Sequence, residues 1–67
     1  MIEPHFLGYI RDVFPPGLST QQVVDLRRTF YAGVSVALDI IPSDSQEHFD
    51  LMREVTQFAA DVRAGLR

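Results

Sequence analysis

The chain has 67 residues, a net charge of −3 and no cysteine. A chain of this length folds as one small domain, and its acidic balance excludes the basic footprint that general nucleic-acid binding requires. Small domains usually need an extra device to support so limited a core. Because no disulfide or thiolate metal site can form, we expect that device to be association between copies.

The first predicted helix spans about residues 4–13. Pro4 suits the first position of a helix, where its missing N–H is not needed. Apolar side chains then recur at helical spacing, at Phe6, Ile10 and Val13 or Phe14. Pro15 and Pro16 end the segment, and the residue before a proline is expected to be extended.

The second predicted helix, from about residue 20 to residue 41, has the clearest start signal in the chain. Ser19 can cap it, and Gln22 three residues later completes a capping box. Pro42 ends it, because a proline inside a helix removes a hydrogen bond and clashes with the preceding turn.

Apolar residues surround most of this second helix. One stripe is apolar (Val23, Leu26, Phe30, Val34, Ala37 and Ile41), and the opposite stripe is polar (Asp25, Arg28, Ala32, Ser35 and Asp39). One partner helix cannot cover so much apolar surface, so we expect a homo-oligomer. Gly33 costs about 1 kcal/mol relative to alanine at mid-helix, and we interpret it as a point of close packing rather than a tolerated glycine. The predicted interface comprises Phe30, Gly33, Val34, Ala37, Leu38 and Ile41.

The third predicted helix spans about residues 44–64. Its start offers two possible capping boxes, Asp44 with Glu47 or Ser43 with Gln46, and Gly65 suits its C-terminal end. The short connection predicts an antiparallel pair with the second helix. The predicted fold is therefore all-α: a short N-terminal helix followed by an antiparallel αα-hairpin, in a single domain over residues 1–67.

Metal and catalytic sites find little support. Glu47, Asp50 and Glu54 share one face of the third helix, as in helical magnesium sites. We interpret them as a solvated acidic face, because the second helix offers only Asp25 and Asp39, both on its polar stripe. His48 could pair with Asp44 around a metal, but no further ligand stands at suitable spacing. We predict no enzyme activity, no metal and no cofactor.

The strongest candidate site is polar. Arg27, Arg28 and Tyr31 are spaced so that their side chains can converge, and they offer guanidinium forks for phosphate together with an aromatic face. Ser35 and Asp39 lie one and two turns further along and could reach a ribose or a base. An alternative is purely structural: Arg28 could pair with Asp25, or with Asp39 of another copy.

The stretch DLRRTFYAGVSVAL resembles a motif of small, uncharacterised phage-encoded helical proteins, in which Arg-Arg-x-Phe-Tyr-Ala-Gly follows a proline-containing loop. The matching residues are Pro15, Pro16, Gln22, Arg27, Arg28, Phe30, Tyr31, Ala32 and Gly33. The resemblance covers about the middle third of the chain. It implies a phage or prophage origin and action in the bacterial cytoplasm, where small non-enzymatic phage proteins often counter host defence.

The leading hypothesis is a homo-oligomeric sponge that binds and sequesters a small anionic nucleotide signal, such as a cyclic nucleotide. Arg27, Arg28, Tyr31, Ser35 and Asp39 are its predicted ligand-binding residues. One alternative is an inhibitor or adaptor that binds a host protein through a helical surface, and another is a purely structural oligomer. No signal peptide and no membrane span are expected, because no basic leader or long apolar run is present.

Overall fold

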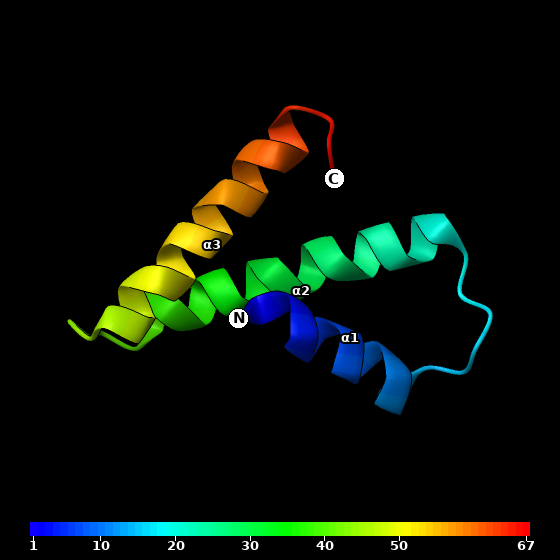
Figure 1. The fold of residues 1–67 in the computed structure, drawn as a ribbon, viewed down its shortest axis with the longest axis horizontal. Coiled ribbons are helices and arrows are strands. Elements are labelled where there is room, and N and C mark those ends of the chain that lie inside the picture. The colour runs from blue at the N-terminus through cyan, green and yellow to red at the C-terminus, as the bar shows by residue number, and fades with distance from the viewer.

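The computed structural model describes all 67 residues and contains three α-helices. These are α1 (Ile2–Val13), α2 (Thr20–Ile40) and α3 (Gln46–Arg63) (Figure 1). The all-α class and the hairpin of α2 and α3 are confirmed. Each helix begins and ends within two residues of the position expected from the sequence.

The start of α2 is built as its sequence indicates. The Ser19 hydroxyl accepts a hydrogen bond from the Gln22 backbone N–H at 3.1 Å, and the Gln22 side chain accepts from the Ser19 N–H at 2.7 Å. Before it, Phe14 is extended at φ −109° and ψ 147°, as a residue preceding a proline should be. Gly17 has φ +98°, which lets the connecting loop turn towards α2.

The start of α3 differs from both predicted capping boxes. Ser45 is the capping residue, and its hydroxyl accepts from the His48 backbone N–H at 3.2 Å. Ser43 instead accepts a hydrogen bond from the Ser45 N–H, at 3.2 Å, and so belongs to the loop. With three serine or aspartate residues in a row, local pattern alone did not decide which one caps the helix.

The end of α3 is closed by Gly65, as predicted. Its φ of +78° is favourable only for glycine, and Leu66 N–H reaches the Asp61 carbonyl at 2.9 Å while Gly65 N–H reaches that of Val62 at 3.1 Å. This Schellman turn directs the chain back towards α2. The Arg67 guanidinium consequently lies 5.0 Å from the centre of the Phe58 ring.

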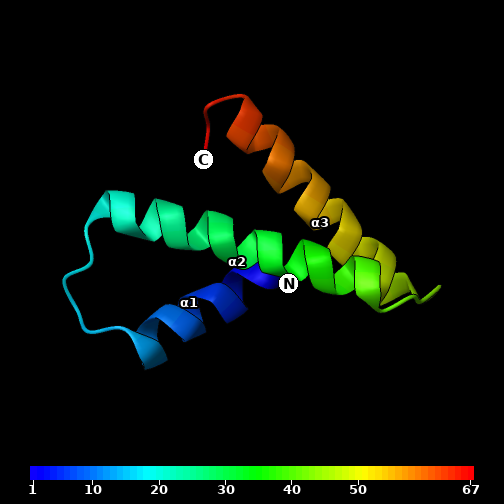
Figure 2. The ribbon, with the colours of Figure 1, turned by 180° about the vertical axis from the view of Figure 1, so that it is seen from behind.

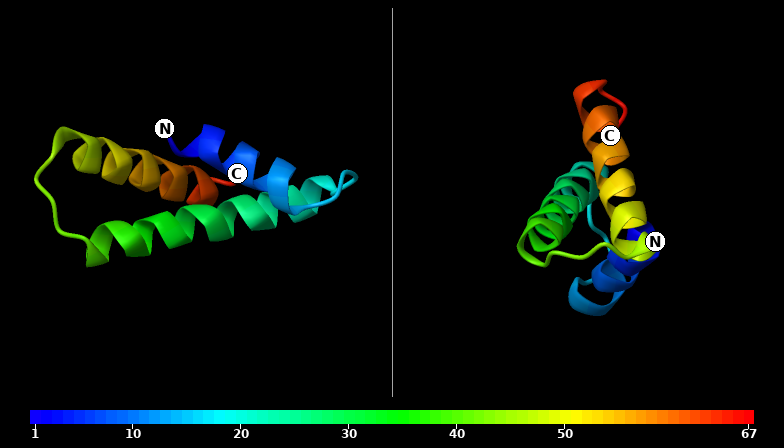
Figure 3. Two further views of the ribbon diagram at one scale, coloured as in Figure 1. Left: turned by 90° about the horizontal axis from the view of Figure 1, so that it is seen from below. Right: turned by 90° about the vertical axis from the view of Figure 1, so that its left-hand side faces the viewer.

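Both flanking helices rest on the same face of α2 and diverge from it to opposite sides (Figures 2 and 3). The covered face is centred on Tyr31, which is 3% exposed and forms the core with Ile2 and Phe58. On the α1 side, Phe6 packs edge-on against Phe30 with ring centres 5.5 Å apart.

The apolar stripe predicted from Val23 to Ile41 therefore coincides only in part with the face of α2 that the structure covers. Phe30 and Val34, expected at an interface between copies, pack against α1 and the core of their own chain. The covered face is centred on Tyr31 and not on the predicted stripe. Tyr31 can be buried because Glu3 of α1 accepts a hydrogen bond from its hydroxyl.

The molecule is open rather than tightly packed. Its radius of gyration is 12.8 Å, whereas a compact domain of 67 residues would have about 11 Å. The reason is visible in Figure 1, where α2 and α3 meet at the hairpin turn and spread apart towards their other ends. None of the three helices combines the length and apolar character needed to cross a membrane.

We expect Ser19→Ala to lower the free energy of unfolding by about 1 kcal/mol, because the capping box satisfies N–H groups that the first turn of α2 leaves free. Urea unfolding followed by circular dichroism measures the change. Thr56→Ala is a suitable control, since it removes an exposed hydroxyl within α3 that caps no helix. Equal midpoints for the Ser19 variant and the wild type would show that the box does not stabilise α2.

Candidate functional site

Arg27 and Tyr31 bind a residue of their own chain. Glu3, in the first turn of α1, accepts a hydrogen bond from Arg27 Nε at 2.9 Å on Oε1 and one from the Tyr31 hydroxyl at 2.8 Å on Oε2. The Arg27 Nη2 atom also lies 2.9 Å from Oε1, and its guanidinium stands 4.9 Å from the Phe6 ring centre. Two of the predicted ligand-binding residues thus hold α1 against α2.

Tyr31 also contacts α3. Its ring stacks on Phe58 with centres 3.9 Å apart and an angle of 10° between the planes. Burial in this position, followed by the hydrogen bond to Glu3 and the charge of that carboxylate, raises the pKa of Tyr31 to about 12. The neutral phenol is therefore the form that the fold favours.

Arg28 points elsewhere. It lies beside the opening between α2 and α3, and its guanidinium donates a hydrogen bond to the Arg67 carbonyl oxygen. No Asp or Glu side chain lies within ion-pair distance of Arg28, so the alternative pair with Asp25 does not form; Asp25 accepts instead from Gln21, at 2.9 Å. Although Arg27 and Arg28 are adjacent in sequence, Arg27 therefore contacts α1, whereas Arg28 lies at the opening between α2 and α3.

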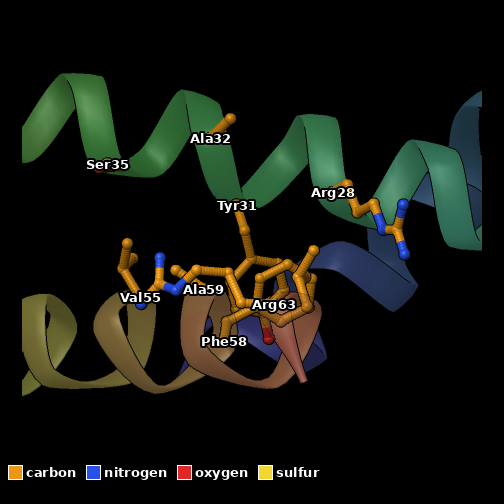
Figure 4. A pocket seen from close by; sticks show the side chains of 9 residues that line it. Arg28, Tyr31, Ala32, Ser35, Val55, Phe58, Ala59 and Arg63 are labelled. Carbon is orange, nitrogen blue, oxygen red and sulfur yellow. The ribbon is translucent and has the colours of Figure 1, made fainter. Parts of the chain in front are cut away.

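A cleft of about 330 Å³ lies between α2 and α3. Most of its wall is apolar or aromatic, and Figure 4 shows the stacked rings of Tyr31 and Phe58 at its centre, with Arg28 extending along α2 away from them. The α2 helix contributes Arg28, Tyr31, Ala32 and Ser35; the α3 helix contributes Val55, Phe58, Ala59, Val62 and Arg63. We call this the α2–α3 cleft.

The arginines of this cleft differ from most others in the chain. Arg11 pairs with Asp12, Arg27 with Glu3 and Arg53 with Asp50. Arg28 and Arg63, from opposite sides of the cleft, pair with no Asp or Glu side chain. Arg28 is already hydrogen-bonded to the Arg67 backbone oxygen, so an anion would have to share or displace that bond, and both guanidinium groups are exposed at the mouth of the cleft.

Of the five predicted ligand-binding residues, Arg28, Tyr31 and Ser35 line the cleft. Arg27 does not, and Asp39 is exposed outside it. Sequence reasoning missed Arg63, Phe58 and the small residues of α3. Phe58 and Val62 stand at helical spacing in α3, but no local pattern could show which turn of α2 they would face.

The acidic residues of α3 are spread over separate contacts. Glu54 accepts a hydrogen bond from the Ile2 backbone N–H at 2.7 Å and lies 3.2 Å from the N-terminal ammonium group. Asp50 accepts from Gln46 at 2.8 Å. No three acidic or histidine side chains are grouped so that they could hold a metal ion.

No protein family, curated protein or solved structure matches the chain in sequence or fold comparisons. The candidate site accordingly rests on its own geometry and charge.

The raised pKa of Tyr31 predicts a loss of stability in alkali. The fold favours the neutral phenol, so its contribution is complete below pH 10, the ordinary pKa, and is lost as the pH rises from about 10 to about 12. We expect the free energy of unfolding to fall by roughly 2–3 kcal/mol over this range. Urea unfolding at successive pH values measures it.

The matched variant is Tyr31→Phe, which keeps the ring on Phe58 but has no proton to lose. Its stability should decline less between pH 10 and pH 12 than that of the wild type. An identical alkaline decline in both proteins would assign the titration to another group.

Proposed function

We propose that this chain is a non-enzymatic binding protein that holds a small anionic ligand of nucleotide type in the α2–α3 cleft. The observation that carries the proposal is the pair Arg28 and Arg63, which bind no Asp or Glu side chain and flank an apolar, aromatic-lined cavity. Guanidinium groups beside an apolar wall suit a ligand with a charged end and a flat, less polar body.

Each part of a nucleotide has a matching contact in this proposal. Arg28 and Arg63 bind phosphate, and Ser35 offers a hydroxyl to the sugar. The base lies against the wall formed by Ala59, Val62 and the edges of the stacked rings. Arg27 keeps its bond to Glu3 and positions Tyr31 rather than touching the ligand.

The biological role in this proposal is sequestration of a nucleotide immune signal by a homo-oligomer in the bacterial cytoplasm, as a phage counter-defence. That role rests on the resemblance of the Arg27–Gly33 segment to phage-encoded proteins. The alternatives remain a protein-binding inhibitor or a structural oligomer. Exposed apolar residues at the start of α3, Phe49 and Met52, favour protein binding as the second candidate.

A panel of cyclic mono- and dinucleotides and ADP-ribose derivatives tests the proposal. We expect at least one of them to raise the melting temperature, because a ligand that binds only the folded state stabilises it. For that compound, isothermal titration calorimetry should show that Arg28→Ala and Arg63→Ala each weaken binding about tenfold or more, since a hydrogen bond to a charged group contributes roughly 1.5–3 kcal/mol.

Arg11→Ala is the matched control. It removes the same charge from an exposed position outside the cleft and should leave the affinity unchanged. Equal weakening by all three substitutions would indicate non-specific attraction to net charge. No stabilisation by any compound in the panel would overturn the proposal, and co-purification of a host protein sensitive to Phe49→Glu would favour the second candidate.

A further inference from the structure

The segment Gly65–Arg67 turns back from the end of α3 towards α2 (Figure 1). Two hydrogen bonds fix the turn, since Leu66 N–H donates to the Asp61 carbonyl oxygen at 2.9 Å and Gly65 N–H donates to that of Val62 at 3.1 Å. The φ of Gly65, +78°, is one that glycine adopts without strain. The segment therefore leaves α3 in a defined direction.

Arg67, at the far side of this turn, contacts both walls of the α2–α3 cleft. Its backbone oxygen accepts a hydrogen bond from the Arg28 guanidinium of α2. Its own guanidinium stands 5.0 Å from the ring centre of Phe58 of α3, which is within the range of a cation–π contact. The same ring stacks on Tyr31 with centres 3.9 Å apart. The segment thus spans the end of the cleft at which α2 and α3 diverge.

The charges around the Arg67 side chain favour this position. The side chain borders a hollow in which acidic groups outnumber basic ones, with Glu3, Asp50, Glu54 and Asp61 against Arg53. None of these carboxylates is within ion-pair distance of Arg67, so their attraction acts at longer range and is screened by salt. Arg67 is therefore held by several weak contacts, which a competing group can replace.

We propose that Gly65–Arg67 is a strap, held by Arg28, which closes the open end of the α2–α3 cleft and regulates access to it. For the regulation of ligand binding this inference rests on the proposed function, which assigns Arg28 to phosphate. A phosphate oxygen and the Arg67 backbone oxygen accept hydrogen bonds from the same guanidinium, so they compete for it. Only chains with the strap released offer Arg28 to the ligand, and the apparent affinity falls by the fraction that is released.

NMR of the ligand-free chain tests the strap itself. Protons above the face of an aromatic ring resonate upfield, so the Arg67 side-chain signals should lie upfield of their random-coil positions. Arg28→Ala should move them towards the random-coil positions while the helix content persists. Arg11→Ala removes the same charge from an exposed position outside the cleft and should leave the Arg67 signals unchanged.

Two results of this experiment would overturn the proposal. One is a wild type whose Arg67 signals already have random-coil positions, which would show that the strap is not closed. The other is an upfield position that Arg28→Ala does not change, which would show that Arg28 does not hold the strap.

Calorimetric titration with inorganic pyrophosphate tests the competition for Arg28. Gly65→Val should release the strap without changing any charge, because a β-branched residue does not adopt the φ of Gly65 without strain. We expect this variant to bind pyrophosphate about threefold or more tightly than the wild type. Gly17→Val is the matched control, since Gly17 also has a positive φ, +98°, and a Cβ atom at either glycine meets nothing within 4 Å. Its affinity should equal that of the wild type.

A second measurement does not depend on the glycine variants. Saturating pyrophosphate should move the Arg67 signals of the wild type towards their random-coil positions, because the anion displaces the backbone oxygen from Arg28. Pyrophosphate binding that leaves these signals in place, or binding to Gly65→Val that is no tighter than to the wild type, would contradict the regulatory role of the strap.

The strap and the proposed function fail in different ways. If Arg28→Ala releases the strap but neither the wild type nor Gly65→Val binds pyrophosphate or any nucleotide of the panel, the strap is retained and the proposed ligand site is wrong. If a nucleotide binds through Arg28 and the Arg67 signals of the ligand-free wild type are those of random coil, the ligand site is retained and the strap is wrong.

Discussion

The carboxylate of Glu3 is the contact on which the arrangement of the three helices depends. It binds Arg27 and the Tyr31 hydroxyl of α2, and Tyr31 in turn stacks on Phe58 of α3. A phenol can be buried at the centre of so small a core only if its hydroxyl has a partner, because an unsatisfied buried hydroxyl is costly. Glu3 supplies that partner, and one tyrosine side chain thereby links α1, α2 and α3.

This central tie leaves two surfaces of α2 with different chemistry. Because α1 and α3 crowd around Tyr31, their far ends diverge, and the opening on the α3 side becomes the cleft with Arg28 and Arg63. The opposite surface, around Gly33, stays bare and apolar. The proposed ligand site follows from this packing around Tyr31.

Local chemistry predicted the helices well. Capping by Ser19 and Gln22, the extended Phe14 before two prolines, and the turn at Gly65 depend on residues a few positions apart, so sequence spacing was sufficient. The contacts of the candidate site were harder to predict from the sequence. The spacing of Arg27 and Tyr31 predicted that they converge on an anionic ligand. Their acceptor in the structure is Glu3, which lies more than twenty residues away and whose position depends on how α1 folds back.

The separation of the two adjacent arginines has the same origin. Successive helical residues point about 100° apart, so Arg27 faces α1 whereas Arg28 faces the α2–α3 cleft. Helical periodicity could not predict which of the other two helices would pack on each side of α2, because that depends on the tertiary structure. Arg63 was missed for the same reason, since nothing local distinguishes it from any other arginine near the end of a helix.

A double-mutant cycle between Glu3→Ala and Tyr31→Phe tests the central tie most directly. Free energies of unfolding from urea titration should show a coupling of about 1 kcal/mol or more, because the two side chains lose one shared contact. The pair Glu3→Ala and Tyr9→Phe is the reference and should be additive within about 0.5 kcal/mol. Additivity for Glu3 and Tyr31 as well would contradict the claim that this contact organises the fold.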